Sequence, residues 1–361
     1  MTSQTSNQIG TAGVGNLNGA RNPLLSVREL RTVFHAREGT VVAVDGISFD
    51  VYPGEVFSIV GESGSGKSVT AMSIMQLINP PGEIVSGQIL LEEVDMIGMS
   101  KSQLRKLRGA EMSMIFQDPM TSLNPVYTIG NQLGEPLKIH KGYGRKEALE
   151  ASIAALAEVG IPNPKDRIRD YPHQFSGGML QRVAIAMAMI TKPKLVIADE
   201  PTTALDVTIQ AQILDLLLGL SQTHGTSIVL ITHDLGVVAN VSDRTAVMYA
   251  GQIHEAGTTS EVFENPHGPY VWGLLDSIPR LEGDVSQKLA QITGQPPSPS
   301  EVFRGCHFGP RCPYQEGRCI ESEPTAVSIS PGHTARCHFA GASGWPKKRT
   351  VSAREPSPNG D

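Results

Sequence analysis

The sequence predicts an α/β fold: a parallel β-sheet covered by helices, with an antiparallel β subdomain, a helical insertion and a small cysteine-containing C-terminal extension. Three observations support this prediction. Residues 25–51 alternate apolar and polar side chains, residues 180–257 alternate helical and strand patterns, and the four cysteines all lie between residues 306 and 337. At 361 residues the chain exceeds one usual core, so a large domain and a smaller unit are expected.

Composition and charge indicate what kind of protein this is. With 40% hydrophobic residues and a formal net charge of −6, the chain has the composition of a soluble globular protein and no electrostatic reason to bind nucleic acid. No stretch reaches the roughly 18 consecutive apolar residues of a membrane-spanning helix, so any membrane role is expected to act through a partner. Residues 1–24 lack the pattern of a secretory signal and, like residues 346–361, predict a flexible tail. A cytoplasmic protein is expected.

The predicted elements begin with antiparallel strands over residues 25–51, where β-branched residues are frequent. EVFSIVG, residues 55–61, is the short apolar run of a buried parallel strand, and residues 67–78 follow with helical periodicity. A helical insertion over about residues 121–180 contains the amphipathic segment 146–161. These patterns predict a strand, a loop and a helix, followed by a helical subdomain.

The alternation of helix and strand resumes after the insertion. The predicted elements are helix 180–190, strand 195–199, helix 207–222, strand 227–232 and hairpin 244–257. Such alternation is typical of a parallel sheet with helices on its faces. Beyond residue 263 the periodicity fades while Pro, Gly and Cys increase, so residues 263–345 are expected to form the second unit.

Residues 61–68, GESGSGKS, match the phosphate-loop pattern G-x-x-x-x-G-K-[ST] between a predicted strand and a predicted helix. Glycines let successive backbone N–H groups point at phosphate oxygens, and the helix N-terminus adds partial positive charge. Lys67 is expected to reach the β- and γ-phosphates of ATP, and the Ser68 hydroxyl to bind Mg²⁺. A Gly/Ser-rich turn that matches by chance is the alternative. The nucleotide-binding residues expected in this stretch are Gly61, Ser63, Gly64, Ser65, Gly66, Lys67, Ser68 and Val69.

Two acidic residues stand at the end of the predicted strand LVIAD. Asp199 is expected at the carboxyl edge of the sheet, facing the phosphate loop, where it would hold the Mg²⁺ shell. Glu200 follows and is placed to polarise the attacking water; a solvated acidic residue before a Pro turn is the alternative for Glu200. Together with the phosphate loop, this pair predicts a P-loop NTPase core.

FSGGMLQR, residues 175–182, resembles the signature motif of ABC-transporter ATPases, which usually reads LSGGQ. IFQDP with Gln117, TALD at residues 203–206 and ITHD with His233 stand in the order of that family. The resemblance implies an ABC nucleotide-binding domain over residues 25–262 that hydrolyses ATP to ADP and phosphate.

The resemblance also implies roles for individual residues. Gln117 would sense Mg²⁺ and the γ-phosphate near the contact with a membrane subunit. His233 would hold the attacking water; a histidine that caps the end of a strand is the alternative. Phe34 would stack on adenine, unless it is a core aromatic. The expected catalytic residues are Glu200, His233, Gln117 and Lys67, and the expected Mg²⁺ ligands are Ser68, Gln117 and Asp199.

The same resemblance implies that one copy of the chain does not complete its own site. In this family, residues at the positions of Ser176, Gly177 and Gly178 begin a helix that contacts the γ-phosphate held by the opposite subunit, and Asp206 would cross the interface. The chain has one set of motifs. The working unit is therefore expected to be a homodimer or, as the preferred interpretation, a heterodimer with a second ABC ATPase.

NPHGPYVWGLLDSIPRL, residues 265–281, resembles the C-terminal extension of the oligopeptide, dipeptide and nickel importer branch, usually written H-P-Y. Here Gly268 separates His267 from Pro269. The resemblance implies an ATPase at the cytoplasmic face of the cell membrane that powers import of di- or oligopeptides. Its implied partners are two integral membrane permease subunits and an extracytoplasmic substrate-binding protein, with no nucleic acid. Import of nickel or another solute is an alternative, as is a non-transport ABC ATPase of DNA repair or translation.

The cysteines follow the spacing C-x5-C-x6-C-x17-C and are Cys306, Cys312, Cys319 and Cys337. A cytoplasmic protein keeps its thiols reduced, so metal binding is predicted rather than disulfides. The wide spacing and the branch resemblance favour a [4Fe–4S] cluster on four thiolates. Zinc, with His307 or His338 as substitute ligands, and unligated buried thiols are the alternatives. The arginines that precede three cysteines, and are expected to offset the negative charge of a cluster, are Arg311, Arg318 and Arg336.

Overall fold

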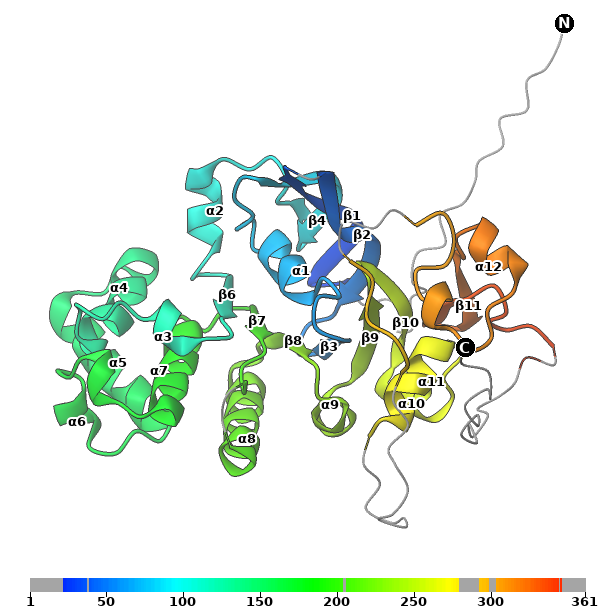
Figure 1. The fold of residues 1–361 in the computed structure, drawn as a ribbon. Helices are drawn as coiled ribbons and strands as arrows, with labels where there is room; N and C mark the ends of the chain where they lie inside the picture. The colour runs from blue at the N-terminus through cyan, green and yellow to red at the C-terminus, as the bar shows by residue number, and fades with distance from the viewer. Residues whose placement is uncertain are drawn as a thin grey trace, which may run out of the picture.

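The computed structural model describes residues 22–37, 39–203, 206–278, 292–298, 303–343 and 345. Figure 1 shows a helical region at one end of the molecule, the sheets in the middle and the cysteine-containing extension at the other end. Of the two predicted tails, residues 346–361 and all but residues 22–24 of the first lie outside the described residues. No helix in the described ranges combines the length and the apolar character that crossing a membrane requires.

The central sheet of the described residues has eight strands. From one edge to the other they are β11 (Ala326–Ser330), β12 (His333–Arg336), β10 (Gln252–Thr258), β9 (Arg244–Tyr249), β3 (Val56–Val60), β8 (Ser227–Thr232), β7 (Leu195–Asp199) and β6 (Met112–Ile115). The five strands from β9 to β6 run parallel. Every residue of β3, β7 and β8 is buried, which explains the continuous apolar runs that predict these strands.

Helices follow the parallel strands and cover the sheet, as the alternating pattern predicts. Helix α1 (Lys67–Ile74) follows β3, α8 (Val207–His224) follows β7, and α9 (Leu235–Val241) follows β8. Helix α1 ends at Ile74, before the predicted end at residue 78. The N-cap of α8 is Asp206, whose carboxylate accepts a hydrogen bond from a backbone N–H in the first turn.

The antiparallel subdomain is a second sheet with the strand order β2-β1-β4-β5. Strands β1 (Leu25–Ala36) and β2 (Gly39–Val51) confirm the prediction for residues 25–51. Strands β4 (Gly82–Leu91) and β5 (Val94–Asp95) are not predicted by the sequence patterns. Apolar side chains from β1, β2 and β4 pack in one cluster with α1 and β3, so the subdomain is joined to the phosphate-loop region through a common core.

The predicted helical insertion is confirmed, and Figure 1 shows its helices at the end of the molecule opposite the extension. Leu133, Leu156 and Phe175 belong to an apolar cluster that continues into β7 and α8, so the insertion shares a core with the central sheet. The helices of the insertion are α3 (Pro119–Ser122), α4 (Ile129–Lys141), α5 (Arg145–Glu158), α6 (Pro164–Arg167), η1 (Pro172–Gln174) and α7 (Gly177–Met189). One more helix, α2 (Lys101–Leu107), lies outside the insertion and precedes β6.

The extension adds two strands to the central sheet and is not a separate domain next to it. Its hairpin β11–β12 continues the sheet, because β12 pairs antiparallel with β10 at the positions Glu255 and Ala335. The composition of residues 263–345 predicts a second unit here, and no sequence pattern predicts this shared sheet. The helices of the extension in the described residues are α10 (Thr259–Glu264), α11 (Pro269–Asp276), η2 (Gly309–Arg311) and α12 (Gly317–Glu321).

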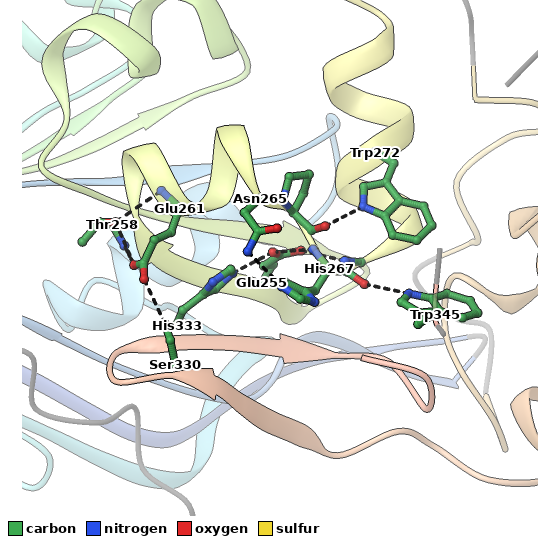
Figure 2. Close-up of polar contacts among 11 residues, drawn as sticks. Glu255, Thr258, Glu261, Asn265, His267, Trp272, Ser330, His333 and Trp345 are labelled. Atoms are coloured by element: carbon green, nitrogen blue, oxygen red, sulfur yellow. Dashed lines mark hydrogen bonds and ion pairs between the residues drawn. The ribbon is translucent and has the colours of Figure 1, made fainter. Parts of the chain in front are cut away.

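Glu255 of β10 holds two segments of the extension, as Figure 2 shows. Its fully buried carboxylate accepts hydrogen bonds from the backbone N–H groups of His267 and Gly268, each at 2.8 Å. His333 Nε2 lies 2.8 Å from the same carboxylate. A Cβ on Gly268 would lie 3.2 Å from Glu255 Oε2, so a glycine between His267 and Pro269 lets the backbone reach the carboxylate. The start of α11 and strand β12 are thereby fixed to β10.

Candidate active site

The phosphate loop joins β3 to α1 and lies close against two neighbouring strands. Gly61 has φ 154° and Gly66 has φ 103°, backbone conformations that favour glycine. A Cβ at Gly61 would lie 2.0 Å from the Met248 carbonyl oxygen, and one at Gly66 would lie 2.3 Å from that of Ala43. Glycine is therefore required at both positions for the loop to approach β9 and β2.

Lys67 is folded back onto the loop. Its Nζ donates hydrogen bonds to the carbonyl oxygens of Gly61 and Glu62, both at 2.8 Å, and the residue is 5% exposed. Burial lowers the pKa of Lys67, and the charges of Glu200, Asp199 and Glu62 oppose this shift. The ammonium group therefore lies among carboxylates, at the end of the loop where phosphates are expected.

Ser68 and Asp199 connect the start of α1 to the end of β7. Ser68 Oγ donates a hydrogen bond to Asp199 Oδ1 at 3.0 Å. Burial raises the pKa of Asp199, and the hydrogen bond from Ser68 works against that rise. A divalent cation beside this carboxylate would stabilise its ionised form, and Mg²⁺ takes hydroxyl and carboxylate oxygens as ligands. The pair therefore fits a magnesium site.

Two predicted catalytic residues, Gln117 and His233, meet at the carboxylate of a third, Glu200. Gln117 Nε2 donates to Glu200 Oε2 at 3.1 Å, and His233 Nδ1 lies 3.4 Å from Glu200 Oε1. Thr203 Oγ1 also donates to Oε2, at 2.8 Å, an interaction that the sequence patterns do not predict. Glu200 has φ 46°, a strained conformation for a residue with a side chain and one that recurs at functional sites. A carboxylate, an imidazole and an amide thus lie together beside the phosphate loop.

Gln117, Glu200 and His233 line a cleft of about 1140 Å³. Phe34 of β1 is half-buried and lines the same cleft, so its ring is open to a bound molecule. Ser65 and Asp199 are buried. The predicted site residues that line the cleft are Phe34, Ser63, Gly64, Gly66, Lys67, Ser68, Val69, Gln117, Glu200 and His233.

The extension also contributes residues to the cleft, and the sequence patterns do not predict this contribution. Phe303, His307, Glu323 and Arg336 line it, and the rings of Phe303 and His307 lie with their centroids 4.5 Å apart. They reach the cleft only because the extension folds back onto the central sheet. No local sequence pattern marks residues that come together in this way.

The signature segment lies away from this cleft. Ser176 is the N-cap of α7 and accepts a hydrogen bond from the Met179 N–H at 3.4 Å. Ser176 and Gly177 are exposed, and Gly178 is half-buried. Asp206 accepts from the Ile209 N–H at 3.0 Å. Ser176, Gly177, Gly178 and Asp206 are not among the described residues that line the cleft.

The four cysteines are free thiols and surround one small cavity together with Tyr270 and Phe308. Burial raises the pKa of Cys306 to about 11 and that of Cys312 to about 12, and it raises the pKa of Cys337. Across the described parts of the chain, no three His, Cys, Asp or Glu side chains converge as ligands of a metal ion. The four thiols therefore surround one cavity, although they do not form the ligand set of a single metal ion in the described residues.

The side chains beside the cysteines differ from the sequence expectation. His307 Nδ1 lies 3.1 Å from the Ala250 carbonyl oxygen, and this histidine lines the nucleotide cleft instead of the cysteine cavity. Arg311 pairs with Glu62, and Arg336 pairs with Glu323. Arg336 also lines the cysteine cavity, whereas Arg311 does not, so the expectation that these arginines offset the charge of a cluster stays a prediction. The third arginine, Arg318, lies over the ring of Phe339 at 3.7 Å.

Comparisons with known proteins agree with this geometry. Residues 44–203 match the ABC transporter family, and residues 254–319 match the oligopeptide/dipeptide transporter C-terminal region. The chain is 51% identical to the dipeptide transport ATP-binding protein DppD of Bacillus subtilis, over 87% of this chain and 94% of that protein. It is 50% identical to the oligopeptide transport ATP-binding protein OppD of Bacillus subtilis, over 86% of this chain and 87% of that protein.

A solved structure shares the fold of the cassette. A dimeric ATP-binding cassette in a post-hydrolysis state, bound to ADP and Pi, is 26% identical with a TM-score of 0.59. The match covers 65% of this chain and 98% of that chain. From these matches and the geometry of the cleft, the chain belongs to the family of ABC transporter ATPases, in the branch with the oligopeptide/dipeptide transporter C-terminal region.

Proposed function

We propose that this ABC ATPase binds ATP and Mg²⁺ in the cleft and powers the import of di- or oligopeptides across the cytoplasmic membrane. The observation that supports hydrolysis most directly is the meeting of Gln117, Glu200 and His233 beside the phosphate loop. Peptides are the proposed solute because relatives named for dipeptide and oligopeptide transport match this chain over most of its length.

The chemistry follows from the arrangement of these residues. Glu200 accepts a proton from the attacking water, and His233 holds that water in place. Backbone N–H groups of the phosphate loop and the Lys67 ammonium stabilise the charge on the phosphates. Lys67 must first leave the carbonyl oxygens of Gly61 and Glu62, to which it is bonded here. When bound, Mg²⁺ neutralises part of the phosphate charge.

The proposed assembly contains more than one chain. Ser176, Gly177 and Gly178 lie away from the cleft of their own chain, and two of them are exposed, which supports their use in a second subunit's site. We infer a heterodimer with a second ABC ATPase, bound at the cytoplasmic face of the membrane to two permease subunits. An extracytoplasmic substrate-binding protein delivers the solute.

Reconstitution tests this function. The ATPase is combined with its candidate partner ATPase, permeases and binding protein in vesicles, and the uptake of labelled di- and oligopeptides is followed with ATP on the ATPase side. ATP-dependent peptide uptake that is absent with the Lys67→Ala variant is the expected result. Uptake of Ni²⁺ without peptide uptake would assign the chain to the nickel alternative, and ATP hydrolysis without transport of either would contradict the importer proposal.

We also propose that the four cysteines hold a [4Fe–4S] cluster, with zinc as the alternative. All four line one cavity as free thiols, and a cluster takes four thiolates. The raised pKa values of Cys306, Cys312 and Cys337 favour the protonated thiols, whereas a bound metal stabilises the thiolate form. The role proposed for the cluster is structural or regulatory, because hydrolysis requires none of its chemistry.

Metal analysis separates the two alternatives. Protein purified without air should be brown and contain iron and sulfide, and a variant with Cys312→Ser and Cys319→Ser should lose both. Stoichiometric zinc without iron would overturn the cluster in favour of the alternative.

A further inference from the structure

Glu62, the second residue of the phosphate loop, is held at three points by side chains from elsewhere in the chain. Arg311 Nη1 donates to Glu62 Oε2 at 2.7 Å, and Arg311 Nη2 donates to Oε1 at 3.1 Å. The Glu62 backbone N–H donates to Tyr270 Oη at 3.1 Å. Lys67 Nζ donates to the Glu62 carbonyl oxygen at 2.8 Å. Two of the three points therefore come from the C-terminal extension and the third from the phosphate-binding lysine.

The contact with the extension is shielded from water. The Arg311 side chain is 7% exposed and the Glu62 side chain 22% exposed. Arg311 also donates to Tyr249 Oη at 3.3 Å and to the Thr293 carbonyl oxygen at 3.1 Å, so its guanidinium is fixed from several sides. A bidentate pair of this kind is stronger and more directional than an exposed ion pair.

The Tyr270 side chain is also held in place, by burial and by neighbouring aromatic rings. It is 1% exposed, and its ring centroid lies 4.6 Å from that of Tyr249 and 5.3 Å from that of Phe308. The three aromatic residues belong to one apolar cluster, which also contains Val60 at the end of β3. The hydroxyl that meets the Glu62 N–H is thus carried by a rigid group.

These contacts matter most when nucleotide arrives. Lys67 must then turn from the Gly61 and Glu62 carbonyl oxygens to the phosphates, so Glu62 loses one of its three side-chain contacts. Arg311 and Tyr270 make no bond that this movement breaks. They remain to hold the loop in the conformation that its glycines define, and a loop held in its binding conformation loses less conformational freedom on binding.

We propose that Arg311 and Tyr270 are positioning residues for the phosphate loop, through which the C-terminal extension sets the affinity of this ATPase for ATP. Neither side chain touches the reacting atoms in this role. Their loss raises the Kd and KM for ATP and leaves kcat close to its normal value.

The test uses the full chain with its partner subunits and compares Arg311→Gln, Arg311→Lys and Tyr270→Phe. Loss of a charge-assisted hydrogen bond corresponds to a roughly tenfold weaker affinity. We expect Arg311→Gln to raise the Kd and KM for ATP by about tenfold, Arg311→Lys to restore part of the loss, and Tyr270→Phe to raise both by about threefold. The matched control is Arg318→Gln, which removes an extension arginine that also precedes a cysteine and leaves the Kd unchanged.

A double-mutant cycle shows whether the effect passes through Glu62. Glu62→Gln combined with Arg311→Gln should weaken ATP binding no more than the stronger single change. The proposal rests on ATP binding by this chain and does not depend on which solute is transported or on whether the cysteines bind a metal. Binding of ATP to the wild type, measured in parallel, shows whether the chain binds ATP at all, and the variants then show whether Arg311 and Tyr270 set the affinity. If Arg311→Gln does not fold, Tyr270→Phe carries the test because it removes one hydroxyl. Unchanged ATP affinity in both variants, or an equal loss in Arg318→Gln, would overturn the proposal.

Discussion

Gln117 Nε2 donates a hydrogen bond to Glu200 Oε2 across 3.1 Å, although the two residues are 83 positions apart in the chain. Thr203 Oγ1 donates to the same oxygen, so the other carboxylate oxygen, Oε1, is the one beside His233. The Glu200 carboxylate is thereby oriented, with one oxygen held by two donors and the other turned toward the imidazole. An oriented carboxylate of this kind suits a general base.

The Glu200→Gln variant tests this role. The amide keeps the shape of the side chain but does not accept a proton at neutral pH, so kcat should fall by roughly 10²–10⁴-fold. ATP binding should persist, because the phosphate loop and Lys67 are untouched. Release of phosphate and binding of a fluorescent ATP analogue measure the two quantities. Unchanged turnover would show that Glu200 is not the base.

A mixing experiment tests the partner of the signature segment. Ser176→Arg blocks the segment that serves a second site, whereas Glu200→Gln disables the base of the chain's own site. A mixed dimer of these two variants has one site with a normal base and a normal signature segment. We expect no recovery of ATPase activity on mixing, because the proposed partner is a different chain. Recovery would show that two copies of this chain form the working dimer.

The Glu255 network predicts a large effect on stability from one buried residue. His333→Ala removes one of the three donors to a fully buried carboxylate, so the free energy of unfolding should fall by about 3 kcal/mol. The control is Ser330→Ala in the same hairpin, which removes a half-buried hydrogen bond to Glu261 and should cost less than about 1 kcal/mol. Denaturant unfolding measures both. Equal losses would contradict a special role for Glu255.

His254 predicts a pH dependence of stability. Its ring is buried against Tyr249 and Tyr270, and burial, together with the charges of Arg336 and His307, lowers its pKa from 6.5 to about 3. Between these two values the unfolded chain binds a proton on this residue and the folded chain does not. The free energy of unfolding therefore falls as the pH falls through this window.

The His254→Phe variant removes this titration. Its stability should decline less than that of the wild type between pH 6.5 and about pH 4, as measured by urea unfolding at a series of pH values. The variant also removes a buried nitrogen, Nε2, that has no hydrogen-bond partner within the described structure. Identical pH slopes for the two proteins would show that other groups cause the acid sensitivity.

Much of the core follows from local sequence patterns. The strand β3, the phosphate loop and the start of α1 are encoded in consecutive residues, so an apolar run, a glycine motif and a helical period predict them together. Strand β6 is missed because four residues, MSMI, are too few to show a period. Strand β4 is also missed. It pairs with β1, but the pairing of two strands distant in the chain is not visible in the local sequence pattern.

Local sequence patterns do not predict the tertiary contacts of the extension. Arg311 is interpreted from the sequence as a partner of the cysteines because it precedes Cys312, yet its carboxylate partner is Glu62, 249 positions away. Glu255 and His333 are likewise 78 positions apart. Adjacency in sequence fixes neither the direction of a side chain nor its partner across a sheet, and these contacts are set by the packing of the whole chain.

The pairing of β12 with β10 has a consequence for colloidal behaviour. A strand left at the border of a sheet offers unpaired backbone groups to other chains, which favours aggregation. Trimming the protein back to its cassette would expose β10, a seven-residue strand, in this way. In the intact chain the edge strand on this side of the sheet is β11, which has five residues. We therefore expect the cysteine-bearing extension to protect this edge of the catalytic sheet from pairing with other molecules.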